Sequence, residues 1–123
     1  MILIVEDDED SRDAYLEFLE SLGFRVSGVG TGEDAVAAAR TTRFDAVLLD
    51  LTLPDVDGRV LCDRLQELAA PRVVPVLALT GHSLDAGERA RFTMVMQKPV
   101  DLDALAEWLR TIAPPRATAA DGG

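Results

Sequence analysis

The sequence has few of the features that mark secreted or membrane proteins. Its 123 residues include a single cysteine, Cys62, so no internal disulfide can form, which fits a reducing compartment. The first residues lack a basic stretch before an apolar run, and no window approaches the roughly 20 apolar residues that a membrane helix needs. We therefore expect a cytoplasmic protein without a membrane partner.

Basic residues are scarce as well. Lysine and arginine number 12 against 22 aspartates and glutamates, a net charge of −10, whereas nucleic-acid binding needs clustered cations. We therefore expect no direct nucleic-acid partner. Five acids are consecutive, from Glu6 to Asp10. We interpret residues 8–10 as a solvated loop, and Glu6 and Asp7 as the end of a core strand because they follow the apolar residues 2–5.

Apolar patterning divides the chain into alternating strands and helices. Apolar runs predict strands at residues 2–5, 24–29, 44–50, 74–80 and 94–96. Helical spacing and caps predict five helices. The first ends at Gly23, the second runs from Thr31 to Arg40, and the third stops at Pro71. The fourth and fifth span 83–92 and 102–112. This alternation predicts one flavodoxin-like (βα)5 domain over 1–112, a three-layer α/β sandwich around a parallel five-stranded sheet. Residues 113–123 are predicted to be a flexible tail.

Reactive side chains stand where these strands end. Asp50 ends the third strand, Glu6 and Asp7 follow the first, Thr80 ends the fourth and Lys98 follows the fifth. In a doubly wound sheet these ends converge at one edge. Carboxylates so close repel one another unless one is protonated or a cation lies among them. We interpret the group as a Mg2+ site, with Mn2+ able to substitute, that supports phosphoryl transfer onto Asp50.

Four motifs carry a resemblance to a known family. They are the first strand with Glu6-Asp7-Asp8, the Asp50 strand followed by Pro54 and Asp57-Gly58, Thr80-Gly81, and Lys98-Pro99. Each motif alone is weak, but their order and separations make the set specific. From Met1 to about Ile112, the chain resembles the receiver domain of two-component response regulators. This resemblance implies the strand order 2-1-3-4-5.

The resemblance also implies roles for the strand-end residues. Asp50 would be the phosphoacceptor for a histidine kinase or a histidine phosphotransfer protein. Glu6, Asp7, Asp50 and the backbone carbonyl of Thr52 would hold the metal, although the family more often has aspartate at the position of Glu6. Such a domain promotes its own phosphorylation and dephosphorylation but turns over no separate substrate, so we expect a signalling domain and not an enzyme.

The same resemblance implies catalytic and switch residues. Thr80 and Lys98 would contact the phosphoryl group, and the face of the fourth helix, fifth strand and fifth helix would pass the signal to a downstream protein. We expect a monomer or a weak phosphorylation-dependent dimer. Thr80 and Val95 are the switch candidates, but Val95 stands where the family often has an aromatic residue. Val100 and Arg91 stand where phenylalanine and glycine are common.

These departures leave alternatives open. The domain could be a pseudo-receiver, a protein-binding module that signals without phosphorylation, and a free-standing phosphohydrolase is a weaker third hypothesis.

The positions of several single residues also stay open. His82 either borders the site or lies on the surface, and Trp108 either packs in the core or faces a partner. The glycines at 28, 30 and 32 do not match a dinucleotide-binding fingerprint, so we attribute them to a turn and a helix start. The sequence names neither the kinase nor the downstream target.

Overall fold

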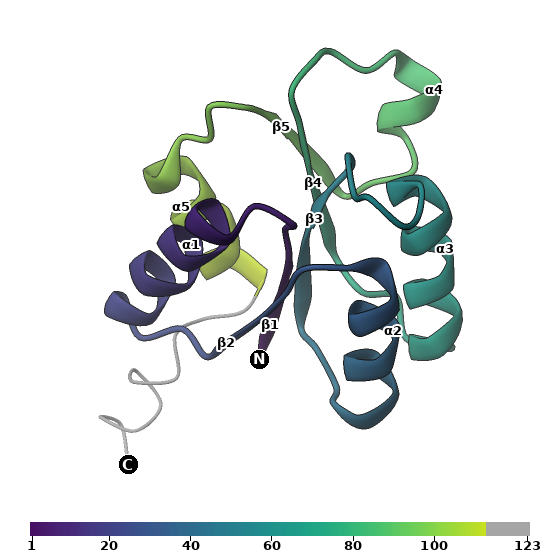
Figure 1. Ribbon diagram of the computed structural model, residues 1–123, viewed down its shortest axis with the longest axis horizontal. Helices are drawn as coiled ribbons and strands as arrows, with labels where there is room; N and C mark the ends of the chain where they lie inside the picture. The colour runs from purple at the N-terminus through teal and green to yellow at the C-terminus, as the bar shows by residue number, and fades with distance from the viewer. Residues whose placement is uncertain (113–123) are drawn as a thin grey trace.

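The computed structural model describes residues 1–112, in which strands and helices alternate (Figure 1). The elements in chain order are β1 (Ile2–Val5), α1 (Glu9–Ser21), β2 (Val26–Val29), α2 (Gly32–Thr41), β3 (Ala46–Asp50), α3 (Gly58–Ala69), β4 (Val76–Thr80), α4 (Ala86–Arg89), β5 (Met94–Gln97) and α5 (Leu102–Ile112). The tail predicted to be flexible, 113–123, lies outside the described residues. Within the described part, none of the helices has the length and apolar character to cross a membrane.

The strands form one parallel sheet in the order β2-β1-β3-β4-β5, which confirms the order implied by the family resemblance. β3 is central, with Val5 of β1 opposite Leu49 on one side and Leu79 of β4 opposite Asp50 on the other. Every residue of β1, β3 and β4 is buried. Nearly continuous apolar runs are typical of parallel strands covered on both faces, which is why the sequence marks these three strands so clearly.

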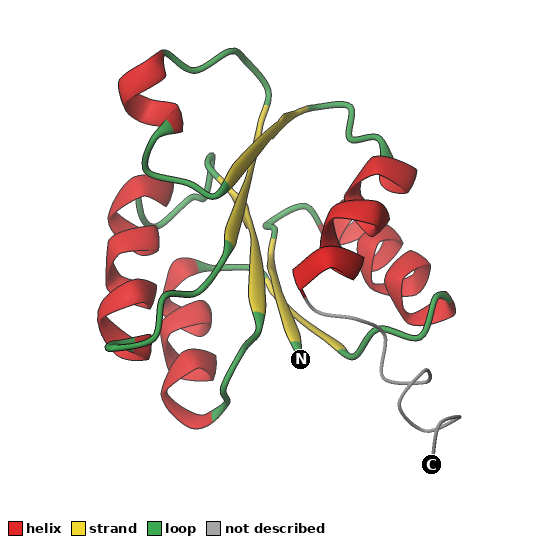
Figure 2. Cartoon of the chain, turned by 180° about the vertical axis from the view of Figure 1, so that it is seen from behind, coloured by secondary structure: helices red, strands yellow, loops and turns green. Residues whose placement is uncertain are grey.

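Helices cover both faces of the sheet and create two buried cores (Figure 2). On one face, Leu19 of α1 and Leu105 of α5 belong to the same buried cluster. On the other face, Ala35 of α2 and Leu61 of α3 belong to the second cluster. Successive residues of the central strands alternate between the two clusters, as the period of a β-strand requires. The predicted three-layer sandwich is confirmed.

The acidic run after β1 is a helix start and not a loop. Asp8 is the N-cap of α1, and its Oδ2 accepts a hydrogen bond from the Ser11 N–H at 3.0 Å. Glu9 and Asp10 form the first turn, where acidic side chains favour the helix dipole. The interpretation as a solvated loop is therefore wrong for residues 9 and 10, whereas Asp8 precedes the helix as its cap, and all three are exposed.

The fourth helix differs most from its prediction. The sequence predicts a helix over 83–92, whereas α4 is a single turn of four residues. It begins late because Asp85 and Glu88 form a capping box, and it buries no residue that would stabilise a longer helix. Gly87 adds no side chain for packing and weakens the helix further.

Three strands begin two residues later than the sequence predicts. Phe24, Phe44 and Val74 precede β2, β3 and β4 and are buried, with exposed fractions of 4–5 %. They belong to the core without belonging to the sheet. Hydrophobic patterning reports burial, so it extends a predicted strand into any buried residue beside it.

Candidate functional site

The reactive residues predicted from the sequence meet at the carboxyl ends of the strands. Glu6 directly follows β1, Asp50 ends β3, Thr80 ends β4, and Lys98 directly follows β5. The backbone N–H of Lys98 donates to the Thr80 carbonyl at 2.7 Å, which continues the pairing of β4 with β5 as far as the site. Ligands of doubly wound sheets bind at this edge.

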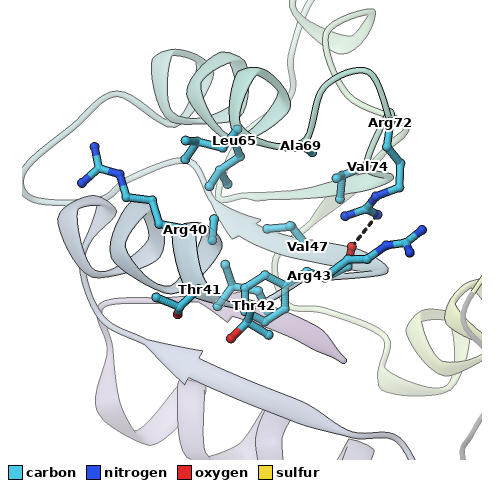
Figure 3. A pocket seen from close by; sticks show the side chains of 13 residues that line it. Arg40, Thr41, Thr42, Arg43, Val47, Leu65, Ala69, Arg72 and Val74 are labelled. Atoms are coloured by element: carbon cyan, nitrogen blue, oxygen red, sulfur yellow. Dashed lines mark hydrogen bonds between the residues drawn. The ribbon is translucent and has the colours of Figure 1, made fainter.

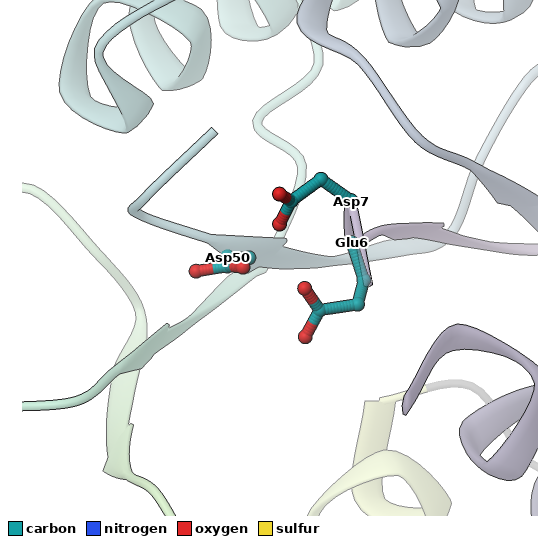
Figure 4. Close-up of side chains that lie close together, drawn as sticks. All are labelled: Glu6, Asp7 and Asp50. Atoms are coloured by element: carbon teal, nitrogen blue, oxygen red, sulfur yellow. The ribbon is translucent and has the colours of Figure 1, made fainter. Parts of the chain in front are cut away.

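Three carboxylates form an acidic cluster, which we define as Glu6, Asp7 and Asp50 (Figure 4). One oxygen from each residue lies within 4.8 Å of the others. Glu6 and Asp50 are buried, whereas Asp7 is exposed to solvent. In Figure 4 the carboxylates of Glu6 and Asp7 extend from the end of β1 toward Asp50. An all-oxygen donor set with one member open to water fits a hard divalent cation such as Mg2+ or Mn2+.

Lys98 balances part of the negative charge. Its Nζ lies 3.1 Å from Glu6 Oε1 and 3.3 Å from Asp50 Oδ2, so one ammonium group bridges two buried carboxylates. Burial disfavours the charged form of Lys98, but its hydrogen bond to Glu6 and the charge of Asp50 outweigh burial and raise its pKa. Lys98 is therefore charged and fixed beside the acidic cluster.

Asp50 is held in its ionised form. Its Oδ1 accepts hydrogen bonds from the Thr52 N–H at 3.0 Å and from the Thr52 hydroxyl at 2.9 Å. Burial opposes ionisation, but the interactions with Glu6, Thr52 and Lys98 together hold the pKa of Asp50 below its ordinary value. Asp50 is thus a carboxylate at neutral pH, with Oδ1 bound to Thr52 and Oδ2 facing Lys98. The role of the Thr52 carbonyl as a metal ligand stays a prediction.

Glu6 holds a proton more tightly than an ordinary glutamate. Burial and the neighbouring carboxylate of Asp50 raise its pKa from 4.5 to about 7, against the lowering effects of Lys98 and the Asp8 N–H. Between these two pH values, folded Glu6 binds a proton that the unfolded chain has already released. The free energy of unfolding therefore falls as the pH rises from 4.5 to about 7.

Glu6→Gln is expected to remove most of this pH dependence. In metal-free buffer, the free energy of unfolding of the wild type should be about 1–3 kcal/mol lower at pH 8 than at pH 5 because Glu6 loses its proton. The variant has no carboxyl group at this position and should lack this decrease. Urea unfolding at both pH values measures the difference. Glu17→Gln, at an exposed position of α1, is the matched control and should keep the wild-type profile. Equal pH profiles for Glu6→Gln and the wild type would contradict the raised pKa.

One contact to the acidic cluster is not predicted from the sequence. Nη1 of Arg12, in α1, donates to the Glu6 carbonyl at 2.9 Å and so fixes the backbone at the end of β1. A Cβ added at Gly30 would lie 3.0 Å from the same nitrogen, and one at Gly28 would lie 2.9 Å from Leu16 Cδ1. Gly28 lies within β2, so its assignment to a turn is wrong, and both glycines make room for side chains of α1. Their spacing in the sequence does not reveal which side chains need the space.

A cavity lies around the start of β3, whereas Asp50 lies at the end of this strand (Figure 3). None of the predicted site residues line it. Its volume is about 330 Å³, and Arg40, Arg43 and Arg72 lie on its rim. Arg72 donates to the Phe44 carbonyl at 2.7 Å. Arg40 lies in the last turn of α2 and Arg72 follows α3, where cations complement the helix dipoles. We therefore attribute these arginines to the helix ends and place the chemistry at Asp50.

A known protein family matches nearly the whole chain. The model described as the response regulator receiver domain covers residues 2–110, which includes all of the strand ends described above. The chain belongs to this family.

Two curated relatives of this receiver domain are much longer than the chain. The sensor histidine kinase RcsC of Salmonella typhi is 33% identical over 118 residues, which cover 92% of this chain and 12% of the kinase. A response regulator receiver protein of Anaeromyxobacter sp. (strain Fw109-5) is 34% identical over 100 residues, which cover 80% of this chain and 42% of that protein. The chain therefore spans less than half the length of either relative.

Solved structures of receiver domains share the fold. A CheY-like receiver domain from Methylobacillus flagellatus has a TM-score of 0.83 and 34% identity, covering 90% of this chain and 96% of that one. The receiver domain of a sensor histidine kinase from Pseudomonas aeruginosa PAO1 has a TM-score of 0.80 and 32% identity, covering 90% and 94%. That structure has a magnesium ion coordinated in its active-site cleft.

Of the two switch candidates of this receiver domain, Thr80 lies at the site and Val95 lies within β5. The Thr80 hydroxyl donates to the His82 carbonyl at 2.9 Å and accepts from the His82 N–H at 3.2 Å, so its hydrogen bonds lie within its own loop. Val95 is half-buried against the core beneath α2 and α3. His82 is exposed and also lines a small cavity with Thr52 and Thr80, so it lies on the surface and borders the site. Trp108 is half-buried against the core beneath α1 and α5, as the packing alternative predicts.

Proposed function

We propose that this receiver domain accepts a phosphoryl group on Asp50 from the phosphohistidine of a histidine kinase or a histidine phosphotransfer protein. The observation that carries the proposal is the state of Asp50, a buried carboxylate at a strand end that Glu6, Thr52 and Lys98 together keep ionised. A carboxylate must be ionised to act as a nucleophile. The membership of the family supports the same role.

Each residue of the site has a part in the proposed transfer. A carboxylate oxygen of Asp50 forms a bond with phosphorus while the bond between phosphorus and the imidazole nitrogen of the donor breaks, and the imidazole leaves. Lys98, which lies 3.3 Å from Asp50 Oδ2, can turn to an oxygen of the incoming group. Thr80 can donate to another oxygen once its hydroxyl leaves the His82 carbonyl.

Glu6, Asp7, Asp50 and the Thr52 carbonyl are the residues that would hold a divalent cation, Mg2+ or Mn2+. Such an ion would neutralise part of the negative charge on the carboxylates and on the phosphoryl oxygens. The acidic cluster, with its oxygens within 4.8 Å of one another, supports this part of the proposal.

Phosphorylation is then proposed to alter the face formed by α4, β5 and α5, which a downstream protein recognises. The new group brings nearly two negative charges and strong hydrogen-bond acceptors to Asp50. Thr80, at the end of β4, and Val95, within β5, remain the switch candidates. The domain is proposed to act in the cytoplasm, as a monomer or a weak phosphorylation-dependent dimer, without turning over a separate substrate.

Phosphoramidate labelling tests the proposed function. Incubation with Mg2+ is expected to add the mass of one phosphoryl group to the intact protein, and chelation of the metal should slow labelling by about tenfold or more. Intact-protein mass spectrometry measures both results. A wild-type protein that remains unlabelled in Mg2+ would overturn the proposal and favour a pseudo-receiver that binds its partner without phosphorylation.

A further inference from the structure

The short helix α4 is not held in place by a buried face. Leu84 before it and Phe92 after it both pack against the core on the α3 side of the sheet. Between these two anchors, the residues of α4 (Ala86–Arg89) include no buried side chain. Figure 1 shows α4 apart from the sheet, beyond the end of α3. Because a single helical turn is unstable by itself, other contacts must fix its position.

A largely polar cleft of about 440 Å³ separates α4 from the start of α3. Its lining residues are Asp57, Arg59, Val60, Asp85, Gly87, Glu88 and Arg91. Two ion pairs join α3 to α4 and the residues just after it. Arg59 Nη1 lies 2.9 Å from Glu88 Oε2, and Arg91 Nη1 lies 3.1 Å from Asp63 Oδ2. Within α4 itself, the contact to α3 is therefore a charged one, whereas the apolar anchors Leu84 and Phe92 lie outside the helix.

Arg59 connects the caps of two helices. On the α3 side, its Nε and Nη2 donate to the N-cap residue Asp57 at 3.1 Å and 2.9 Å, and this arginine holds the pKa of Asp57 at about 2. On the α4 side, its Nη1 reaches Glu88, whose other oxygen accepts the Asp85 N–H in the capping box. We call the group Asp57, Arg59 and Glu88 the α3–α4 clasp.

The clasp borders the proposed phosphorylation site. Arg59 and Glu88 line a cavity of about 100 Å³ together with Thr52 and Thr80. Thr52 is the residue whose N–H and hydroxyl hold Asp50. A phosphoryl group on Asp50 would therefore add negative charge near both members of the Arg59–Glu88 pair. It would attract the guanidinium of Arg59 and repel the carboxylate of Glu88.

We propose that Arg59 is a positioning residue that holds α4 in the unphosphorylated receiver and releases it when Asp50 is phosphorylated. The release rests on the proposed function, whereas the hold rests on the clasp contacts alone. Both partners of the Arg59–Glu88 pair are partly exposed, with side-chain exposures of 43% and 33%, so salt should also weaken the hold. This electrostatic release needs no aromatic residue at Val95.

A fluorine probe on α4 can report the hold. A trifluoromethyl group attached through Arg89→Cys occupies an exposed position of α4 and is observed by 19F NMR. The native Cys62 should not react, because it is 1% exposed and burial raises the pKa of its thiol to about 11. Spectra are recorded for the unphosphorylated protein and after phosphoramidate labelling in Mg2+.

Glu88→Gln and Arg59→Gln are each expected to move the resonance of the unphosphorylated protein at least about half way to its phosphorylated position. The double variant should move it no further than either single variant, because both remove the same pair. Sodium chloride at about 0.5 M should move the wild-type resonance in the same direction. Arg64→Gln, which removes the exposed ion pair with Glu67 within α3, is the matched control and should leave the resonance unchanged.

The outcomes separate this inference from the proposed function. A Glu88→Gln resonance at the wild-type position in both states would overturn the hold. Intact mass on the same samples should show labelling within about twofold of wild type, because the clasp does not contact the acceptor carboxylate. If the wild type takes up no phosphoryl group, the proposed function and the release both fail, and the effect of Glu88→Gln on the unphosphorylated protein decides the hold alone.

Discussion

Asp50→Asn is expected to abolish phosphoryl incorporation, with a loss of rate of at least about 10³-fold. The amide keeps the size of the side chain and can still accept the hydrogen bonds of Thr52, but it provides no carboxylate to attack phosphorus. The wild type and the variant are compared by intact mass after incubation with phosphoramidate and Mg2+. Incorporation at the wild-type level in Asp50→Asn would move the acceptor to another residue and overturn the assignment.

The loss of labelling must not reflect unfolding. Near pH 8, where Glu6 and Asp50 are both ionised, Asp50→Asn leaves one buried carboxylate opposite one ammonium, Lys98. We therefore expect the variant to be at least as stable as the wild type in metal-free buffer at this pH, and urea unfolding measures this. Asp10→Asn, at an exposed position in the first turn of α1, is the control and should keep both labelling and stability.

The geometry of a parallel sheet explains why the sequence predicts the site so well. A buried strand is marked by its apolar run, and all strands of a parallel sheet end at the same side. Reading the residue that follows each run is therefore equivalent to reading one edge of the structure. Glu6, Asp50, Thr80 and Lys98 are found in this way, and the structure brings them to that edge. Their chemical roles remain predictions that the labelling experiments test.

What the sequence does not predict depends on contacts between distant side chains. Arg12 reaches the Glu6 carbonyl because α1 lies over β2, and nothing local to Arg12 indicates this partner. Arg59 and Glu88 are 29 residues apart, and only the arrangement of α3 and α4 makes them a pair. The predicted length of α4 is wrong for the same reason. The extent of a helix with no buried face depends on its caps and ion pairs and not on hydrophobic periodicity.

The sequence places Lys98 at the same edge as Glu6 and Asp50 but does not predict that it bridges them, and this bridge implies two opposing effects of Lys98. In the structure its ammonium group bridges Glu6 and Asp50, the same carboxylates that would hold a divalent cation. Lys98 would therefore compete with such a cation for two of its ligands. During the proposed phosphoryl transfer, however, the same positive charge would stabilise the oxygens of the incoming group. One substitution should separate these effects.

Lys98→Met is expected to slow phosphoryl incorporation by about 10²- to 10³-fold while tightening Mg2+ binding by about threefold to tenfold. Methionine fills a similar volume without the charge, so the acidic cluster loses its competing cation. Labelling is followed by intact mass at saturating Mg2+, and metal affinity by isothermal titration calorimetry.

Arg110→Met removes a cation from an exposed position in the last turn of α5 and should change neither quantity. Weaker Mg2+ binding together with slower labelling in Lys98→Met would indicate a damaged site and contradict the competition between Lys98 and the metal. Labelling at the wild-type rate would contradict the contact between Lys98 and the phosphoryl group. Opposite changes in the two measurements are expected only if one ammonium group serves the carboxylates before transfer and the phosphoryl oxygens during it.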